Sequence, residues 1–196
     1  GGRMTYLVLG LVLFLCVHSV RVVADGWRTR QLQVHGEALY KAVYSLLSVA
    51  GLVLTVYGFG VARETPVLLW SVPIALRHAA SLLLVVAFIL LAAAYVPGNA
   101  IGQRLRHPMV LGVKTWALAH VLSTGRLETA VLFGSFLLWA VLNFAAARRR
   151  DRQAVPPPVP AASSAATVLT VVVGISAYAV FAVLLHGLLI GIRPFG

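Results

Sequence analysis

The chain is poor in charged residues and has a single cysteine. Of its 196 residues, 11% are charged, against about 25% in an ordinary soluble domain. Five residues are acidic and 16 are lysine or arginine, so the formal net charge is +11. Because Cys16 stands alone, an intramolecular disulfide framework and a cysteine-based metal site are excluded. We expect Cys16 to pack as a small hydrophobic residue.

The scarcity of acidic residues excludes several kinds of chemistry. Proton relays and cation transporters usually need buried Asp or Glu, and here all five acids fall in predicted loops or at predicted helix ends. A carboxylate-rich di-metal site is excluded for the same reason. Nucleophilic hydrolysis is disfavoured too, because no buried acid is available to orient a histidine beside Ser19 or Ser123.

Hydrophobic residues make up 60% of the chain and are grouped in long blocks. A helix needs about 20 mostly apolar residues to cross a bilayer. Six segments meet this need: residues 4–23, 42–61, 76–96, 108–122, 130–147 and 167–190. The fourth is the weakest, because it is short and contains Lys114 and His120, and we expect its helix to begin near Asn99. The sequence therefore predicts an all-α, polytopic transmembrane bundle with about six spanning helices.

The basic residues lie between the apolar blocks, where they meet anionic lipid headgroups and set topology, so nucleic acid is not an expected partner. They are concentrated in the first, third and fifth connections: Arg21, Arg28, Arg30, Lys41, Arg104, Arg106 and residues 148–152. For a multi-pass protein of a bacterial-type inner membrane, this asymmetry predicts that both termini lie outside the cytoplasm. We interpret residues 1–3 as vector-derived, residues 4–196 as one domain, and residues 153–165 as a Pro-rich loop.

Histidines are the main candidates for a functional site. Five of the six fall within or at the edge of apolar segments, and they are His18, His78, His107, His120 and His186. The sixth, His35, lies in a polar stretch and is expected to be solvated. Ionisable side chains are costly inside a bilayer, and neutral imidazoles in apolar surroundings are good ligands for haem iron. A haem between two facing helices also suits a helix bundle.

His18 and His120 are the favoured axial ligands. Arg21 follows His18 by three residues, on the same helix face, where it can hold a haem propionate. Trp116 precedes His120 by four residues and can wall the ring pocket, and Lys114 is a candidate for the second propionate. The other ligand candidates are His107, which lies at the start of its segment beside Pro108, and the pair His78 and His186 toward the outer face.

Several motifs carry a resemblance that covers nearly the whole chain. They are residues 13–19, 44–46, 94–99, 106–120 and 185–191, which include an early His-Ser pair and an His-Pro…Trp…Ala-His segment. The chain resembles the NnrU family, which implies a role in nitrite and nitric oxide metabolism during denitrification. That family includes the plastid 15-cis-zeta-carotene isomerase, a haem b enzyme whose iron ligands match His18 and His120. Ala117 stands where the isomerase has a switching cysteine, so its mechanism does not carry over directly.

A weaker resemblance joins Arg106, His107, Pro108 and Gly112 to membrane methyltransferases of the isoprenylcysteine type, but Val110 replaces a tyrosine and the downstream glutamates are missing.

We therefore predict a haem b membrane protein whose partners are the bilayer, a small gas ligand or polyene, and a redox protein. The alternatives are a haem-dependent polyene isomerase and a haem-free assembly factor. Whether the haem chemistry is enzymatic stays open.

Overall fold

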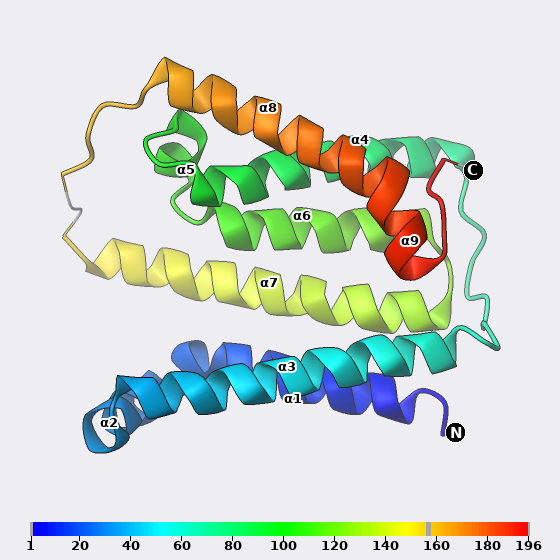
Figure 1. Ribbon diagram of the computed structural model, residues 1–196, viewed down its shortest axis with the longest axis horizontal. Helices are drawn as coiled ribbons and strands as arrows, with labels where there is room; N and C mark the ends of the chain where they lie inside the picture. The colour runs from blue at the N-terminus through cyan, green and yellow to red at the C-terminus, as the bar shows by residue number, and fades with distance from the viewer. Residues whose placement is uncertain (1, 156–157, 196) are drawn as a thin grey trace. The chain divides into compact units, whose positions relative to one another are not determined.

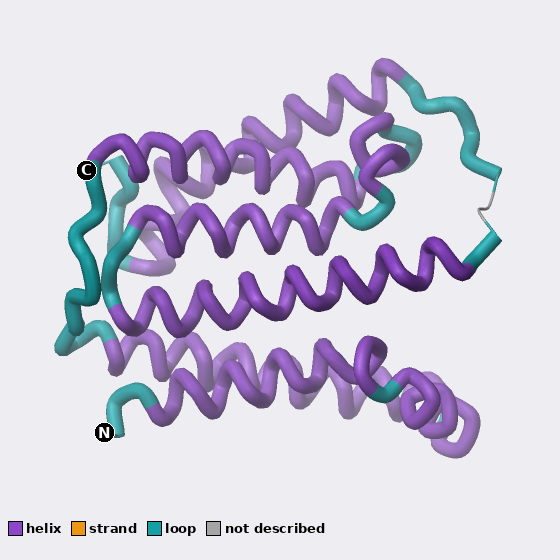
Figure 2. Tube along the Cα trace, turned by 180° about the vertical axis from the view of Figure 1, so that it is seen from behind, coloured by secondary structure: helices purple, strands orange, loops and turns teal. Residues whose placement is uncertain are grey.

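A computed structural model of the protein describes residues 2–155 and 158–195. Within those ranges the regular elements are helices (Figure 2). The extended pairing found there is a single bridge between Leu68 and Arg126. The all-α prediction is confirmed. Residue 1 of the predicted vector-derived segment and residues 156–157 of the predicted Pro-rich loop lie outside the described part of the chain.

Five helices of the described chain are long and apolar enough to cross a membrane. They are α1 (Thr5–Val23), α3 (Glu37–Ala62), α4 (Ile74–Tyr95), α7 (Leu127–Gln153) and the continuous helical segment Ser164–Ile190. The remaining predicted span, the fourth in chain order, forms α6 (Pro108–Ser123), which has 16 residues. At 1.5 Å per residue such a helix is about 24 Å long, short of the ~30 Å hydrocarbon core. Among the described residues, five of the six predicted spans are thus full-length candidates, and the fourth is the short one.

The start of the fourth predicted helix differs from expectation. The Asn99 side chain accepts a hydrogen bond from the Gly102 amide at 2.7 Å, and this cap starts a separate short helix, α5 (Ala100–Leu105). The chain then turns at Arg106 before α6 begins at Pro108. A proline fits the first turn of a helix, where its missing N–H would have no partner. The expected helix from Asn99 is therefore broken in two.

The described chain forms two compact units. The first unit comprises the residues up to Val72 together with Thr124–Ala146, and the second comprises Pro73–Ser123 together with the residues from Ala147 onward. The first therefore holds α1, α2 (Asp25–His35), α3 and most of α7. The second holds α4, α5, α6, the last residues of α7, and the C-terminal helical segment.

In the first unit, α1 and α3 run side by side at close range (Figure 1). Small residues make this approach possible: a Cβ atom on Gly51 would lie 2.8 Å from the Phe14 nitrogen, and one on Gly58 would lie 2.6 Å from the Leu7 Cα. Leu7 is fully buried at this seam. Helices in lipid gain packing energy where small residues let their backbones approach. Gly36, with φ of 82°, separates α2 from α3.

In the second unit, α4 packs against both α6 and α8 (Ser164–Val180), as Figure 1 shows. Gly174 of α8 lies against Ile89 of α4, and Gly112 of α6 lies against Leu91. The C-terminal segment is not a uniform helix. A π-helical turn, η1 (Phe181–Leu185), follows α8 and leads directly into α9 (His186–Ile190).

The exposed side chains are those expected of a protein surrounded by lipid. Along α3, Leu46, Val53 and Val56 are each more than 60% exposed, on faces that a soluble protein would bury. Buried positions are instead rich in alanine, including Ala87 and Ala117. Cys16 is exposed on α1.

Candidate functional site

His18 lies near the C-terminal end of α1 and its ring is held by two neighbours. Nδ1 is 2.7 Å from the carbonyl oxygen of Phe14, one turn earlier. A carbonyl oxygen can only accept, so in the neutral ring Nδ1 donates and Nε2 carries the lone pair. The Phe14 ring stacks on the imidazole with centroids 4.1 Å apart, and the Tyr44 ring lies at 5.4 Å. Nε2 is therefore the ring atom suited to bind a metal.

Trp139 of α7 brings a buried donor close to His18. The two ring centroids are 6.4 Å apart and the ring planes are nearly perpendicular. The indole Nε1 is buried, and it has no hydrogen-bond partner among the described residues. An unpaired buried donor costs about 1–3 kcal/mol and is an exception in folded proteins. This N–H group is thus available to an acceptor atom of a ligand.

A mainly apolar cavity of about 260 Å³ lies between the end of α1, α2 and the start of α3. Tyr44 lines this cavity and also contacts the His18 ring. His35 lines it as well, so this exposed histidine of α2 borders a cavity rather than an open loop. Arg21, the predicted propionate partner, is exposed in the last turn of α1, on the same face as His18.

His120 lies near the end of α6 and repeats the arrangement of His18. Its Nδ1 is 2.9 Å from the Trp116 carbonyl oxygen, so Nδ1 again donates and Nε2 carries the lone pair. The Trp116 ring is 5.2 Å from the imidazole, as the four-residue spacing predicts. Ala117 is fully buried. Lys114, six residues before His120, is half-buried and lies about 240° around the helix axis from it.

The three alternative ligand candidates have different surroundings. His186 directly follows the π turn, and its Nδ1 is 2.6 Å from the Ile192 carbonyl oxygen. His78 is exposed near the start of α4. His107 is engaged through its other nitrogen, with Nε2 2.9 Å from the Asp151 carboxylate. His186 therefore engages the same ring nitrogen, Nδ1, as His18 and His120, whereas the Nε2 of His107 is already used.

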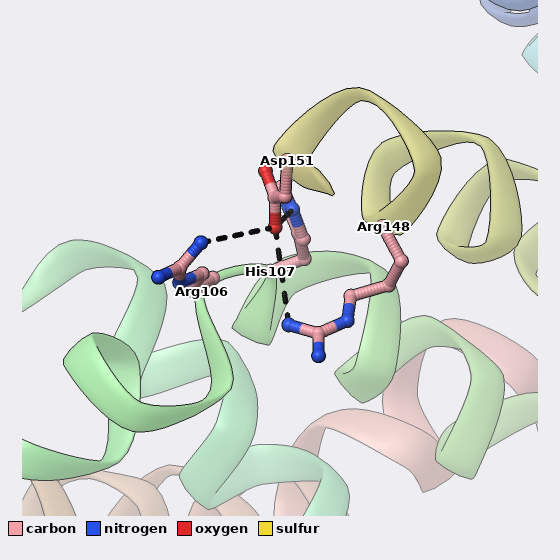
Figure 3. A network of polar contacts seen from close by, with 4 residues as sticks. All are labelled: Arg106, His107, Arg148 and Asp151. Atoms are coloured by element: carbon pink, nitrogen blue, oxygen red, sulfur yellow. Dashed lines mark hydrogen bonds and ion pairs between the residues drawn. The ribbon is translucent and has the colours of Figure 1, made fainter. Parts of the chain in front are cut away.

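The His107 contact is part of a polar network in the second unit, shown in Figure 3. One carboxylate oxygen of Asp151 accepts the His107 hydrogen bond and also lies 3.9 Å from a guanidinium nitrogen of Arg106 and 3.9 Å from one of Arg148. We call these four residues the Asp151 cluster. The cluster joins the turn between α5 and α6 to the end of α7.

The pKa of the Asp151 carboxyl is lowered from its ordinary value. Asp151 lies beyond the apolar part of α7, which ends at Ala147, where three arginines begin. The hydrogen bond from His107 is the largest cause, and the positive charges of Arg106 and Arg148 act in the same direction. These effects outweigh the partial burial of the carboxyl, which raises its pKa. Asp151 is thus a stable anion that fixes the cationic groups around it.

The predicted site residues are divided between the two units. The first unit contains His18 and Arg21, and the second contains Lys114, Trp116, His120 and the three alternative histidines. The pairing of His18 with His120 therefore stays a prediction. Among residues 2–155 and 158–195, no group of three or more His, Cys, Asp or Glu residues is placed to hold a metal ion. Bis-histidine ligation of haem needs only two protein ligands.

Three polar residues that matter in the structure were not singled out from the sequence. Trp139 was one more aromatic in an apolar block, and nothing local indicates that it faces His18. Asp151 falls within residues 148–152, which are assigned to topology from the sequence. Glu128, assigned to a helix end, is only 2% exposed; it lies in the first turn of α7, where the helix dipole favours a carboxylate. The available signal for Asp151 was that it is the single acid among four arginines in residues 148–152.

Long apolar helices, alanine- and glycine-rich seams and exposed aliphatic faces together define a multi-pass α-helical membrane protein. A family comparison agrees with this class. Residues 6–194 match the family described as NnrU protein, and the chain belongs to that family. No curated protein and no solved structure shows a significant match to the chain.

Proposed function

We propose that this member of the NnrU family binds haem b, with His18 and His120 as the axial ligands of the iron. The observation that supports this most strongly is the setting of His18. Its imidazole is oriented by the Phe14 carbonyl, enclosed by aromatic rings, and placed near the unpaired indole N–H of Trp139. A haem carries both an iron that takes a neutral imidazole nitrogen and carboxylates that accept hydrogen bonds.

The backbone hydrogen bonds of the two histidines support the proposal further. Metal-binding histidines almost always donate their second ring N–H to an acceptor, which fixes the ring and makes the ligating nitrogen more basic. His18 and His120 both do this through the carbonyl four residues earlier. Arg21 is our candidate for one propionate and Lys114 for the other, while Trp116 would flank the macrocycle. His107, His78 and His186 are kept as alternatives to this pair.

The haem iron would supply one-electron redox chemistry and a site for a small gas ligand. The role we propose lies in nitrite and nitric oxide metabolism, as a redox or sensing protein that works with a membrane or soluble redox partner. We place it in a bacterial-type inner membrane with both termini outside the cytoplasm. A polyene isomerase of the plastid kind is less well supported, because the fully buried position 117 is alanine and offers no thiol.

Absorption spectra of the detergent-purified protein test this proposal. We expect about one haem per chain by pyridine haemochrome assay. The oxidised and reduced spectra should be typical of low-spin iron with two histidine ligands. His18→Ala and His120→Ala should each abolish or greatly alter this spectrum, because each removes one axial ligand. His78→Ala tests one of the alternative ligands, because His78 is exposed and under this proposal its loss should leave the spectrum unchanged.

A protein that stays colourless after reconstitution with haem would refute the proposal. Full haem occupancy with an unchanged spectrum in both His18→Ala and His120→Ala would keep haem but reject these ligands. Circular dichroism of each variant separates loss of haem from loss of the fold.

A further inference from the structure

The Asp151 cluster combines a strong positive charge with an anchored geometry. Around its single carboxylate the second unit carries six arginines, all exposed: Arg104, Arg106, Arg148, Arg149, Arg150 and Arg152. Only Arg106 and Arg148 are ion-paired to Asp151 within the described chain. The group therefore keeps a large excess of positive charge that Asp151 does not neutralise.

The backbone at Arg106 is strained. Arg106 has φ of 63°, and it is the one residue other than glycine with a positive φ in the described chain. The amide of His107 donates to the Leu105 carbonyl oxygen at 2.7 Å, which closes a γ-turn around Arg106. This hand of γ-turn is rare and strained. Such strain persists where the surroundings hold it, and it concentrates at ligand-binding positions.

Arg106 and Arg148 retain hydrogen-bonding capacity. Each guanidinium has five N–H groups, and each lies 3.9 Å from the Asp151 oxygen. That separation allows an ion pair but exceeds hydrogen-bond distance. No side-chain hydrogen bond of either arginine is found among the described residues. Asp151 therefore orients two guanidinium groups whose planar donor sets fit a phosphate.

The sequence around the cluster indicates where such a phosphate would come from. The apolar part of α7 ends at Ala147, directly before the arginines, so they stand at the headgroup level of a bilayer. Leu105 and Met109, on either side of the Arg106 turn, expose 37% and 36% of their surface. A ligand with both a phosphate and acyl chains matches this combination of cationic and apolar groups.

We propose that the Asp151 cluster is a binding site for the phosphate of an anionic phospholipid, with Arg106 and Arg148 as the binding residues. Asp151 and His107 act as positioning residues that hold the two guanidinium groups at the turn between α5 and α6. The site lies within the second unit and involves neither His18 nor His120, so this inference does not rest on the proposed pair of haem ligands.

Native mass spectrometry of the delipidated, full-length protein in detergent tests the proposal, with phosphatidylglycerol and phosphatidylcholine as probes. We expect saturable binding of phosphatidylglycerol and weak binding of phosphatidylcholine. An arginine near a lipid headgroup contributes roughly fivefold in affinity, so Arg106→Gln/Arg148→Gln should weaken phosphatidylglycerol binding by about 30-fold. The control Arg30→Gln/Arg77→Gln removes the same charge from exposed arginines elsewhere and should change it less than about twofold.

A second variant guards against misfolding. Arg106→Lys/Arg148→Lys keeps both charges and the ion pairs to Asp151 but removes the planar donor sets, so we expect at least a threefold or so loss of affinity. Equal losses in the control and the cluster variants would overturn the proposal, because binding would then follow total charge alone. Equally tight binding of soluble glycerol phosphate would overturn the lipid assignment and indicate a site for free phosphate esters.

Discussion

Replacing Gly58 by alanine tests how closely α1 and α3 must approach. A Cβ atom at this position would lie 2.6 Å from the Leu7 Cα and nearer still to the Leu7 backbone nitrogen. Ordinary contacts between carbon atoms are about 3.5–4.0 Å long. Both partners of the clash belong to helix backbones, so no side-chain rotation relieves it. The two helices must separate by about 1 Å, which loosens the contacts along their seam.

Gly60→Ala provides a matched control in the same helix, because a Cβ atom on Gly60 would meet nothing within 4 Å. Both substitutions change helix propensity by the same amount, about 1 kcal/mol in favour of alanine. This gain cancels when the two variants are compared. The remaining difference is the overpacking cost at the seam, typically about 1–3 kcal/mol. We therefore expect Gly58→Ala to be less stable than Gly60→Ala by about 1–3 kcal/mol.

Equilibrium unfolding in mixed micelles with increasing SDS, followed by circular dichroism and tryptophan fluorescence, measures this difference in the free energy of unfolding. Equal stability of the two variants would refute the packing argument and show that α1 and α3 are not held in contact at Gly58. A loss in Gly60→Ala as large as in Gly58→Ala would likewise show that the seam is not specific to the face bearing Gly58.

Two further predictions concern buried or partly buried polar groups. Trp139→Phe removes the unpaired indole N–H, so we expect the haem-free protein to keep or gain stability, by up to about 1–2 kcal/mol. In a haem-transfer assay the variant should retain haem less tightly. Unchanged haem retention would show that Nε1 does not contact the ligand. Because the pKa of Asp151 is lowered in the folded protein, its contribution to stability is complete above the unfolded-chain value of about 3.9 and is lost as pH falls through the lower folded value. Asp151→Asn should therefore lower the Tm at pH 7 and flatten the fall of Tm below about pH 4, and an unchanged acid limb in a thermal scan would contradict this.

The fold was predictable where a local signal is strong. Apolar length and composition identify helices such as α1 and α8, because the bilayer demands about 20 apolar residues for each span. The same signal marks α6 as weak, since Lys114 and His120 interrupt it, and the structure makes it the short helix. The break at Arg106 was not predictable, because a positive φ is expected of glycine and only tertiary contacts hold an arginine there.

The candidate site was predictable only within single helices. The contact of Trp116 with His120 follows from a spacing of four residues. The position of Trp139 beside His18 depends on the rotation of α7 about its own axis, and an almost continuously apolar helix carries no periodic signal for that rotation. Likewise, the contact of His107 with Asp151 joins residues 44 positions apart, and no sequence spacing predicts such a pair.

The π turn at Phe181–Leu185 changes which face of the C-terminal helical segment each later residue occupies. A turn closed by i to i+5 hydrogen bonds takes in one residue more than an α-helical turn. Everything after it, beginning with His186, is rotated by about 100° relative to a uniform helix continued from Gly174. Deleting a single residue here would therefore exchange the π turn for an α turn without breaking the helix. Among relatives, a one-residue gap at this point would mark loss of the π turn, with the histidine still on the same face of the helix.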